Sequence, residues 1–104
     1  MNIAKLMQQA KDMQKKVAQA QEEIANAIVT GSAAGGLVTV KMTGRKFVES
    51  IEIKDDAMQD KEELCDLIIA ACREAAEAAD ALSEKKMGDS TGGFNLPKGV
   101  NFPV

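Results

Sequence analysis

The N-terminal part of the sequence carries a group of lysines that could bind phosphate. Residues 1–20 contain four lysines and one acidic residue, Asp12, although the whole chain has 13 basic and 16 acidic residues and a net charge of −3. A lysine ammonium binds phosphate as a point charge and carries little base information. We therefore consider either salt-sensitive, weakly sequence-selective contacts with nucleic acid or the solvated face of a helix. The lysines are Lys5, Lys11, Lys15 and Lys16.

Residue types needed for catalysis or metal binding are scarce. The chain has no His, Tyr or Trp and two Cys, and no Ser or Cys has a base at a recognisable spacing. Cys65 and Cys72 are two helical turns apart, about 10.5 Å, which is too far for a disulfide between them. We expect both thiols to be buried in the core. The adjacent carboxylates of Glu22-Glu23 diverge on a helix, so they are poorly placed to hold a metal ion. From these observations together we predict no enzyme activity, no metal site and no cofactor.

The lysines lie on one long predicted helix, from Asn2 to about Ala27. Its apolar residues are spaced 3 and 4 apart, which is a heptad pattern. At about 1.5 Å per residue the helix is roughly 40 Å long, whereas a compact domain of this size has a radius of gyration of about 13 Å. The helix should therefore project from its domain and need a second copy or a ligand. Its heptad positions are Ile3, Leu6, Ala10, Met13, Val17, Ala20, Ile24 and Ala27.

The next segment predicts a three-stranded antiparallel sheet. An extended piece follows Ile28, Gly35-Gly36 forms a turn, and residues 37–43 and 47–54 alternate between apolar and polar. The alternation puts Val48 on the face opposite Ile51. We expect six apolar residues of the second and third strands to form the core and the dimer contacts: Val38, Val40, Met42, Phe47, Ile51 and Ile53.

A second long helix follows, capped by Asp60 and ending near Gly88 as its C′ residue. Its middle is rich in Ala, so another element can approach closely. The prediction is an α+β fold of order α-βββ-α, with a single domain at residues 1–88 and an irregular tail at 89–104. We expect the tail to dock partly or to order on a partner. The longest apolar run, residues 67–72, is too short to span a membrane, and we expect a cytoplasmic protein.

The sequence resembles the YbaB/EbfC family of nucleoid-associated proteins over nearly its whole length. The similar segments are residues 6–10, 13–16, 21–24, 29–31, 34–38, the Gly44 turn, the acidic link before the second helix, and Leu96-Pro97-Lys98-Gly99. The resemblance implies a cytoplasmic, nucleoid-associated homodimer that joins through its sheets, projects its helices like tweezers and binds double-stranded DNA. It places the DNA-binding surface on the first and last helices, at Lys5, Lys11, Lys15, Lys16, Lys85 and Lys86.

The alternative is a dimeric structural or adaptor protein. Its arms would bind another protein, such as a recombination or replication factor, without touching DNA. The acidic second helix and the apolar tail residues Phe94, Leu96 and Phe102 would then be the working surfaces. Charge reversal of the lysines distinguishes the two hypotheses, because it should abolish DNA binding and leave dimerisation intact.

Overall fold

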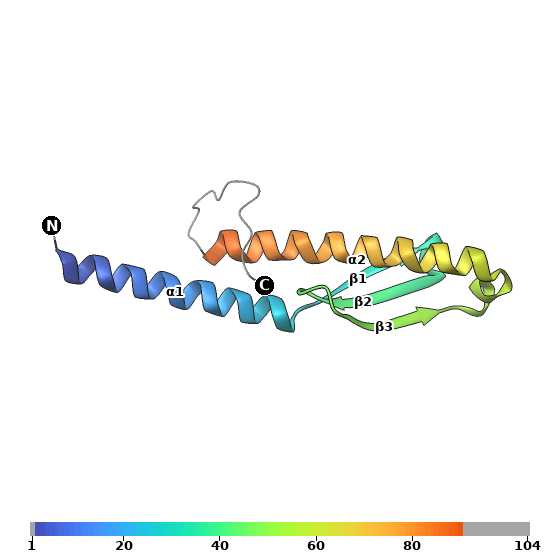
Figure 1. The fold of residues 1–104 in the computed structure, drawn as a ribbon, viewed down its shortest axis with the longest axis horizontal. Helices are drawn as coiled ribbons and strands as arrows, with labels where there is room; N and C mark the ends of the chain where they lie inside the picture. The colour runs from blue at the N-terminus through green and yellow to red at the C-terminus, as the bar shows by residue number, and fades with distance from the viewer. Residues whose placement is uncertain (1, 91–104) are drawn as a thin grey trace.

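The computed structural model describes residues 2–90, in which a sheet lies between two long helices in the chain order (Figure 1). The elements are α1 (Ile3–Asn26), β1 (Ile28–Ala33), the 3-10 turn η1 (Ala34–Gly36), β2 (Val38–Thr43), β3 (Val48–Ile53), the 3-10 helix η2 (Asp55–Gln59) and α2 (Lys61–Ser90). The predicted α-βββ-α order is confirmed. The expectations for residues 91–104 fall outside the described residues.

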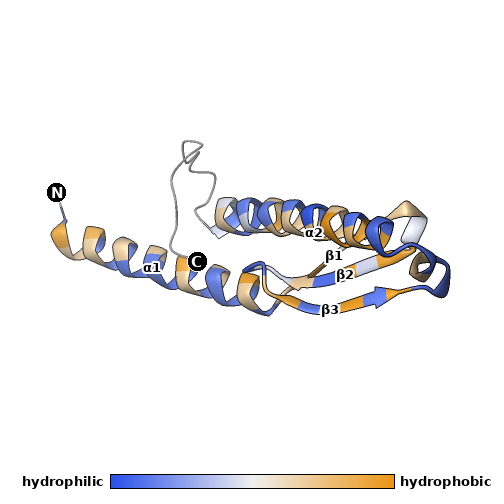
Figure 2. Cartoon of the chain, turned by 45° about the vertical axis from the view of Figure 1, so that its right-hand side comes forward, coloured by the Kyte–Doolittle hydropathy of each residue, from blue (hydrophilic) through white to orange (hydrophobic). Residues whose placement is uncertain are grey.

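The N-terminal half of α1 projects beyond the end of α2, as the predicted length of α1 requires (Figure 1). Asn2 caps α1, since its side-chain oxygen accepts a hydrogen bond from the Lys5 N–H at 3.3 Å. The Cα radius of gyration is 18.6 Å, well above the value of about 13 Å for a compact domain of this size. Apolar residues recur along α1 to its N-terminal end (Figure 2), where Ile3 is 70% exposed.

The inner half of α1 is held by α2, which runs antiparallel to it. Ala20 and Ile24 are buried against Met87 of α2, and Val17 packs beside them. These contacts use the inner part of the heptad pattern. The outer part of the pattern, from Ile3 to Ala10, is exposed.

The sheet has the order β1-β2-β3, and all its pairs are antiparallel. The predicted glycine turn joins β1 to β2. Gly35 has φ 66° and Gly36 has φ 97°, a left-handed backbone that glycine adopts without a steric cost. The turn therefore depends on this pair of glycines.

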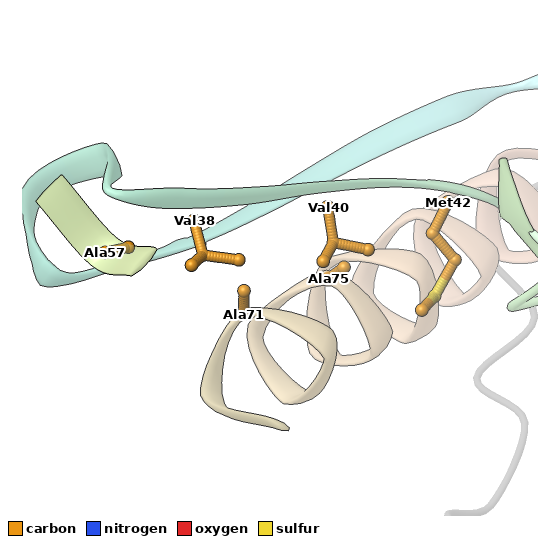
Figure 3. Packing of buried hydrophobic residues seen from close by; sticks show 6 residues of the cluster. All are labelled: Val38, Val40, Met42, Ala57, Ala71 and Ala75. Carbon is orange, nitrogen blue, oxygen red and sulfur yellow. The ribbon is translucent and has the colours of Figure 1, made fainter. Parts of the chain in front are cut away.

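The main core lies between α2 and the sheet (Figure 3). Ala71 and Ala75 of α2 are fully buried against the valines of β2, and Ala57 of η2 closes one end. Alanines keep α2 thin at this point, so the helix backbone comes close to the strands. The close approach leaves no room for a side chain at Gly31 of β1, where an added Cβ would overlap backbone atoms of both alanines.

A bulge alters the predicted faces of β3. Ile51 pairs with Val40, but the register then shifts, so that Met42 pairs with Val48 and Glu49 is the extra residue. Directly paired residues of antiparallel strands share a face, so Val48 returns to the face that carries Met42 and Ile51. The prediction that Val48 lies opposite Ile51 is wrong. The alternation of faces along β3 does not predict the position of Val48, because the bulge adds one residue between Val48 and Ile51.

The six residues expected at the core and dimer contacts divide into two groups. The three on β2 are buried under α2: Val38, Val40 and Met42. The other three are exposed, at 67% for Phe47, 43% for Ile51 and 37% for Ile53. Phe47 precedes β3, and α2 packs on β1 and β2 and leaves β3 uncovered (Figure 1).

Both ends of α2 test a local prediction. At the start, Asp60 Oδ1 accepts hydrogen bonds from the N–H groups of Glu62 and Glu63 at 3.0 and 3.3 Å, which confirms the predicted cap. At the other end the prediction is wrong, because α2 continues through Gly88 to Ser90. One glycine costs a helix only about 1 kcal/mol, and the buried Met87 anchors this turn on α1.

The two cysteines differ in their surroundings. Cys72 is half-buried and packs against the main core, whereas Cys65 is exposed on α2. The prediction that both are buried is wrong for Cys65, which lies in the first turns of α2. The alanine-rich part of α2, further along, provides the fully buried contacts with the sheet.

Candidate nucleic-acid interface

The N-terminal and middle parts of α1 carry four lysines. Lys5, Lys11, Lys15 and Lys16 are all exposed. At 100° per residue Lys11 and Lys15 lie opposite the apolar heptad positions, whose inner members pack against α2, and Lys5 and Lys16 lie to one side of these positions. Lys11 and Lys15 therefore face away from the side that packs on α2, whereas Lys16 lies beside the contact between the two helices.

The lysines form two lines along α1. Lys5 and Lys16 are eleven residues apart, or three turns, and lie on nearly the same line. Lys11 and Lys15 are one turn apart on the other side of the lysine face. The four charges span roughly 16 Å of helix axis at 1.5 Å per residue. A duplex of that length presents about five phosphates on each strand, so the charge density of the arm matches that of one DNA strand.

Few other charges lie on this face of the arm. Its carboxylate, Asp12, accepts a hydrogen bond from the Gln8 amide at 3.1 Å. No ion pair neutralises any of the four α1 lysines within the described part of the chain. Their ammonium groups can therefore meet phosphate without first breaking a protein contact.

The two predicted lysines of α2 are placed differently from those of the arm. Lys85 is exposed, whereas Lys86 is half-buried and its Nζ lies 3.3 Å from Glu23 Oε2 of α1. Lys16 and Lys86 line the same groove between α1 and α2, together with Glu23. The structure thus brings Lys16 and Lys86 together and leaves Lys5 and Lys11 on the outer arm.

The exposed side of α2 is acidic over most of its length. Residues 60–87 carry four basic and eight acidic side chains. The carboxylates exposed beyond the first turn are Asp66, Glu74, Glu77, Asp80 and Glu84. This surface is net negative and unfavourable for phosphate, in contrast to the lysine-bearing part of α1.

Three side-chain contacts between distant residues of the described chain could not be predicted from the sequence. Besides the Glu23–Lys86 pair, Lys46 Nζ lies 2.6 Å from Asp80 Oδ1. Ser32 donates its N–H to a Glu74 carboxylate oxygen at 3.0 Å. Each joins residues more than 30 positions apart, and no local pattern signals such a pairing.

The described residues contain neither a cluster of metal ligands nor a membrane-spanning helix. Within residues 2–90 there is no group of three His, Cys, Asp or Glu side chains that could hold a metal ion. Among the helices described, none is long and apolar enough to cross a membrane.

An exposed cluster of lysines on one part of a helix is a surface suited to the phosphates of nucleic acid. The model of the YbaB/EbfC DNA-binding family matches residues 1–94, and the chain belongs to this family. The family comprises nucleoid-associated DNA-binding proteins and is not an enzyme family.

Similar proteins agree with this assignment. A nucleoid-associated protein of Desulfotalea psychrophila is 48% identical over 104 residues, covering 98% of each chain. A nucleoid-associated protein of Xanthomonas campestris pv. campestris is 46% identical over 102 residues, covering 98% of this chain and 96% of its own. The fold matches the crystal structure of an uncharacterised protein of Helicobacter pylori, with a TM-score of 0.73, 23% identity, and coverage of 88% of this chain and 99% of that one.

Proposed function

We propose that the protein is a homodimer that binds double-stranded DNA through the lysines of its two α1 arms and contributes to nucleoid organisation or gene regulation. One observation carries the proposal: α1 extends beyond the rest of the described chain and carries four exposed lysines, none of which has an ion pair in that part of the chain. We place the protein in the cytoplasm, at the nucleoid. Lys85 adds a second contact region where α2 meets α1, and Lys86 lies next to it in an ion pair with Glu23.

The expected binding mode follows from the residue types. Lysines dominate the interface, and they bind phosphate without reading base edges. When binding releases condensed counterions, log K falls linearly with the logarithm of the salt concentration. The slope is about −0.9 for each phosphate neutralised. Two arms with four lysines each predict a slope of about −7 if every lysine makes a contact.

The sheet has one edge suited to dimerisation. The β1 edge is partly closed, since the Ser32 N–H is bonded to the Glu74 carboxylate. The β3 edge has no described element beyond it, and Val48, Ile51 and Ile53 of β3 are each more than one third exposed. An exposed apolar edge strand is a template for pairing with another chain. We therefore place the dimer contact on β3. The two protomers then form one body from which both α1 arms project.

The experiment that tests the function is a fluorescence-anisotropy titration of two labelled duplexes with unrelated sequences. At low salt we expect both duplexes to bind with affinities within about tenfold of each other, because phosphate contacts carry no sequence information directly. Binding should weaken steeply as salt rises from 50 to 200 mM. Absence of binding to either duplex at 50 mM salt would contradict the proposal.

An adaptor role is the second candidate, and the outer end of α1 favours it. Ile3, Leu6 and Met7 are 70%, 50% and 59% exposed, which is an apolar stripe that a protein partner of the arm could cover. On this hypothesis the arms bind a recombination or replication protein, and lysine variants keep that binding. Loss of DNA binding in lysine variants that still dimerise favours the DNA-binding function.

A further inference from the structure

Lys86 is held by Glu23, an acidic residue at the base of the α1 arm. The two side chains come from different helices, with 3.3 Å between Lys86 Nζ and Glu23 Oε2, and they are 38% and 55% exposed. The Glu23 carboxylate therefore neutralises the Lys86 ammonium group. This ion pair lies on the surface where DNA binding is proposed.

The groove around this pair has no excess positive charge. Lys16, Glu23, Lys86 and Asp89 all line it, so two ammonium groups face two carboxylates in a groove of about 280 Å³. Seven residues along a helix return to almost the same side, so Glu23 continues the line of Lys16 toward the base of α1. The positive potential of that line therefore ends at Glu23.

The helices do not depend on the pair for their packing. Ala20, Ile24 and Met87 are buried in one cluster next to it. Partly exposed ion pairs contribute little to stability, so loss of the Glu23 charge should leave the α1–α2 contact in place.

We propose that Glu23 is the residue that limits DNA affinity and ends the DNA footprint on the arm, because it binds Lys86 and keeps that lysine from phosphate. This inference rests on the proposed DNA-binding function. A phosphate that approaches the groove must compete with Glu23 for Lys86. Removal of the Glu23 charge releases one more lysine in each protomer.

The test compares Glu23→Gln with Glu22→Gln. Both variants remove one carboxylate from the same turn of α1, and Glu22 has no ion pair in the described chain. At 100 mM salt, Glu23→Gln should bind a duplex about three- to tenfold tighter than wild type, with a salt slope steeper by about 2 per dimer. For Glu22→Gln the increase in log K should be less than half of the increase for Glu23→Gln, and the salt slope should equal that of wild type.

Lys86→Gln completes a double-mutant cycle with Glu23→Gln. In the wild-type background Lys86→Gln should change affinity less than twofold, since Glu23 already neutralises the lysine. In the Glu23→Gln background it should remove most of the gain. Equal tightening by Glu22→Gln and Glu23→Gln, or an equal effect of Lys86→Gln in both backgrounds, would overturn the inference and leave the proposed function standing. A wild-type protein that binds no duplex would overturn both.

Discussion

Gly31→Ala is expected to destabilise the fold severely. An added Cβ would overlap the carbonyl oxygen of Ala71 and the backbone nitrogen of Ala75, and would lie 2.9 Å from the Ala75 Cα. These are backbone atoms of a helix that is packed along its length, so α2 must move away from β1. Overpacking of this kind costs about 3 kcal/mol, which lowers the melting temperature by on the order of 15 °C in a domain of this size.

Gly88→Ala is the matched control for this substitution. It adds the same methyl group, but within a helix and with nothing within 4 Å of the added Cβ. Alanine favours helix over glycine by about 1 kcal/mol, so this variant should melt slightly higher than wild type. Both are measured by circular dichroism at one protein concentration, because stability depends on concentration in a dimer. A Gly31→Ala protein that melts within 2 °C of wild type would contradict the close packing of α2 on β1.

Ile51→Glu is expected to convert the dimer into monomers. Ile51 is 43% exposed on the uncovered strand β3, where the dimer contact is proposed. In a two-fold symmetric interface the substitution occurs twice, and each buried carboxylate without a partner costs several kcal/mol. The mass by size-exclusion chromatography with light scattering should fall from twice 11.1 kDa to 11.1 kDa.

Ile69→Glu makes the same side-chain change at a comparably exposed isoleucine on α2, at 51%. This variant should remain dimeric, because the proposed interface lies on β3 and Ile69 is on α2. The Ile51→Glu monomer should also bind DNA more weakly and with a shallower salt slope, since it presents one arm instead of two. If Ile69→Glu dissociates and Ile51→Glu does not, the interface lies on α2 and the assignment to β3 is wrong.

Features of the fold that depend on neighbours in the sequence could be predicted from it. Asn2 and Asp60 cap their helices because a cap needs only the next three residues. The Gly35-Gly36 turn follows from the backbone conformation that glycine permits. The projecting α1 follows from the length of its heptad pattern compared with the size of the domain.

Features that depend on tertiary contacts could not be predicted. The bulge inserts Glu49 into β3, so alternation alone assigns Val48 to the wrong face. Gly88 resembles a helix end, but the packing of Met87 on α1 extends the helix past it. The same holds for the candidate site, where the sequence identifies the lysines but not the contact that holds Lys86.

Glu23 illustrates how a local signal can point to a tertiary contact. Acidic residues near the end of a helix oppose the helix dipole, a cost of a few tenths of a kcal/mol. The structure supplies the missing partner, Lys86, which comes from another helix 63 positions later in the chain. The unfavourable position of Glu23 in the helix dipole could be recognised in the sequence, but its ion pair with Lys86 could not.

The most direct test of the account compares the salt dependence of DNA binding for wild type and for the triple variant Lys11→Gln/Lys15→Gln/Lys16→Gln. The matched control is Gln59→Glu/Ala70→Glu/Ala81→Glu, which changes the net charge by the same amount at exposed positions of η2 and α2. The slope of log K against log salt should become less negative by about 5 per dimer in the lysine variant and should be retained in the control. Equal slopes for the lysine variant and wild type, with both still dimeric, would contradict phosphate binding by the α1 arms.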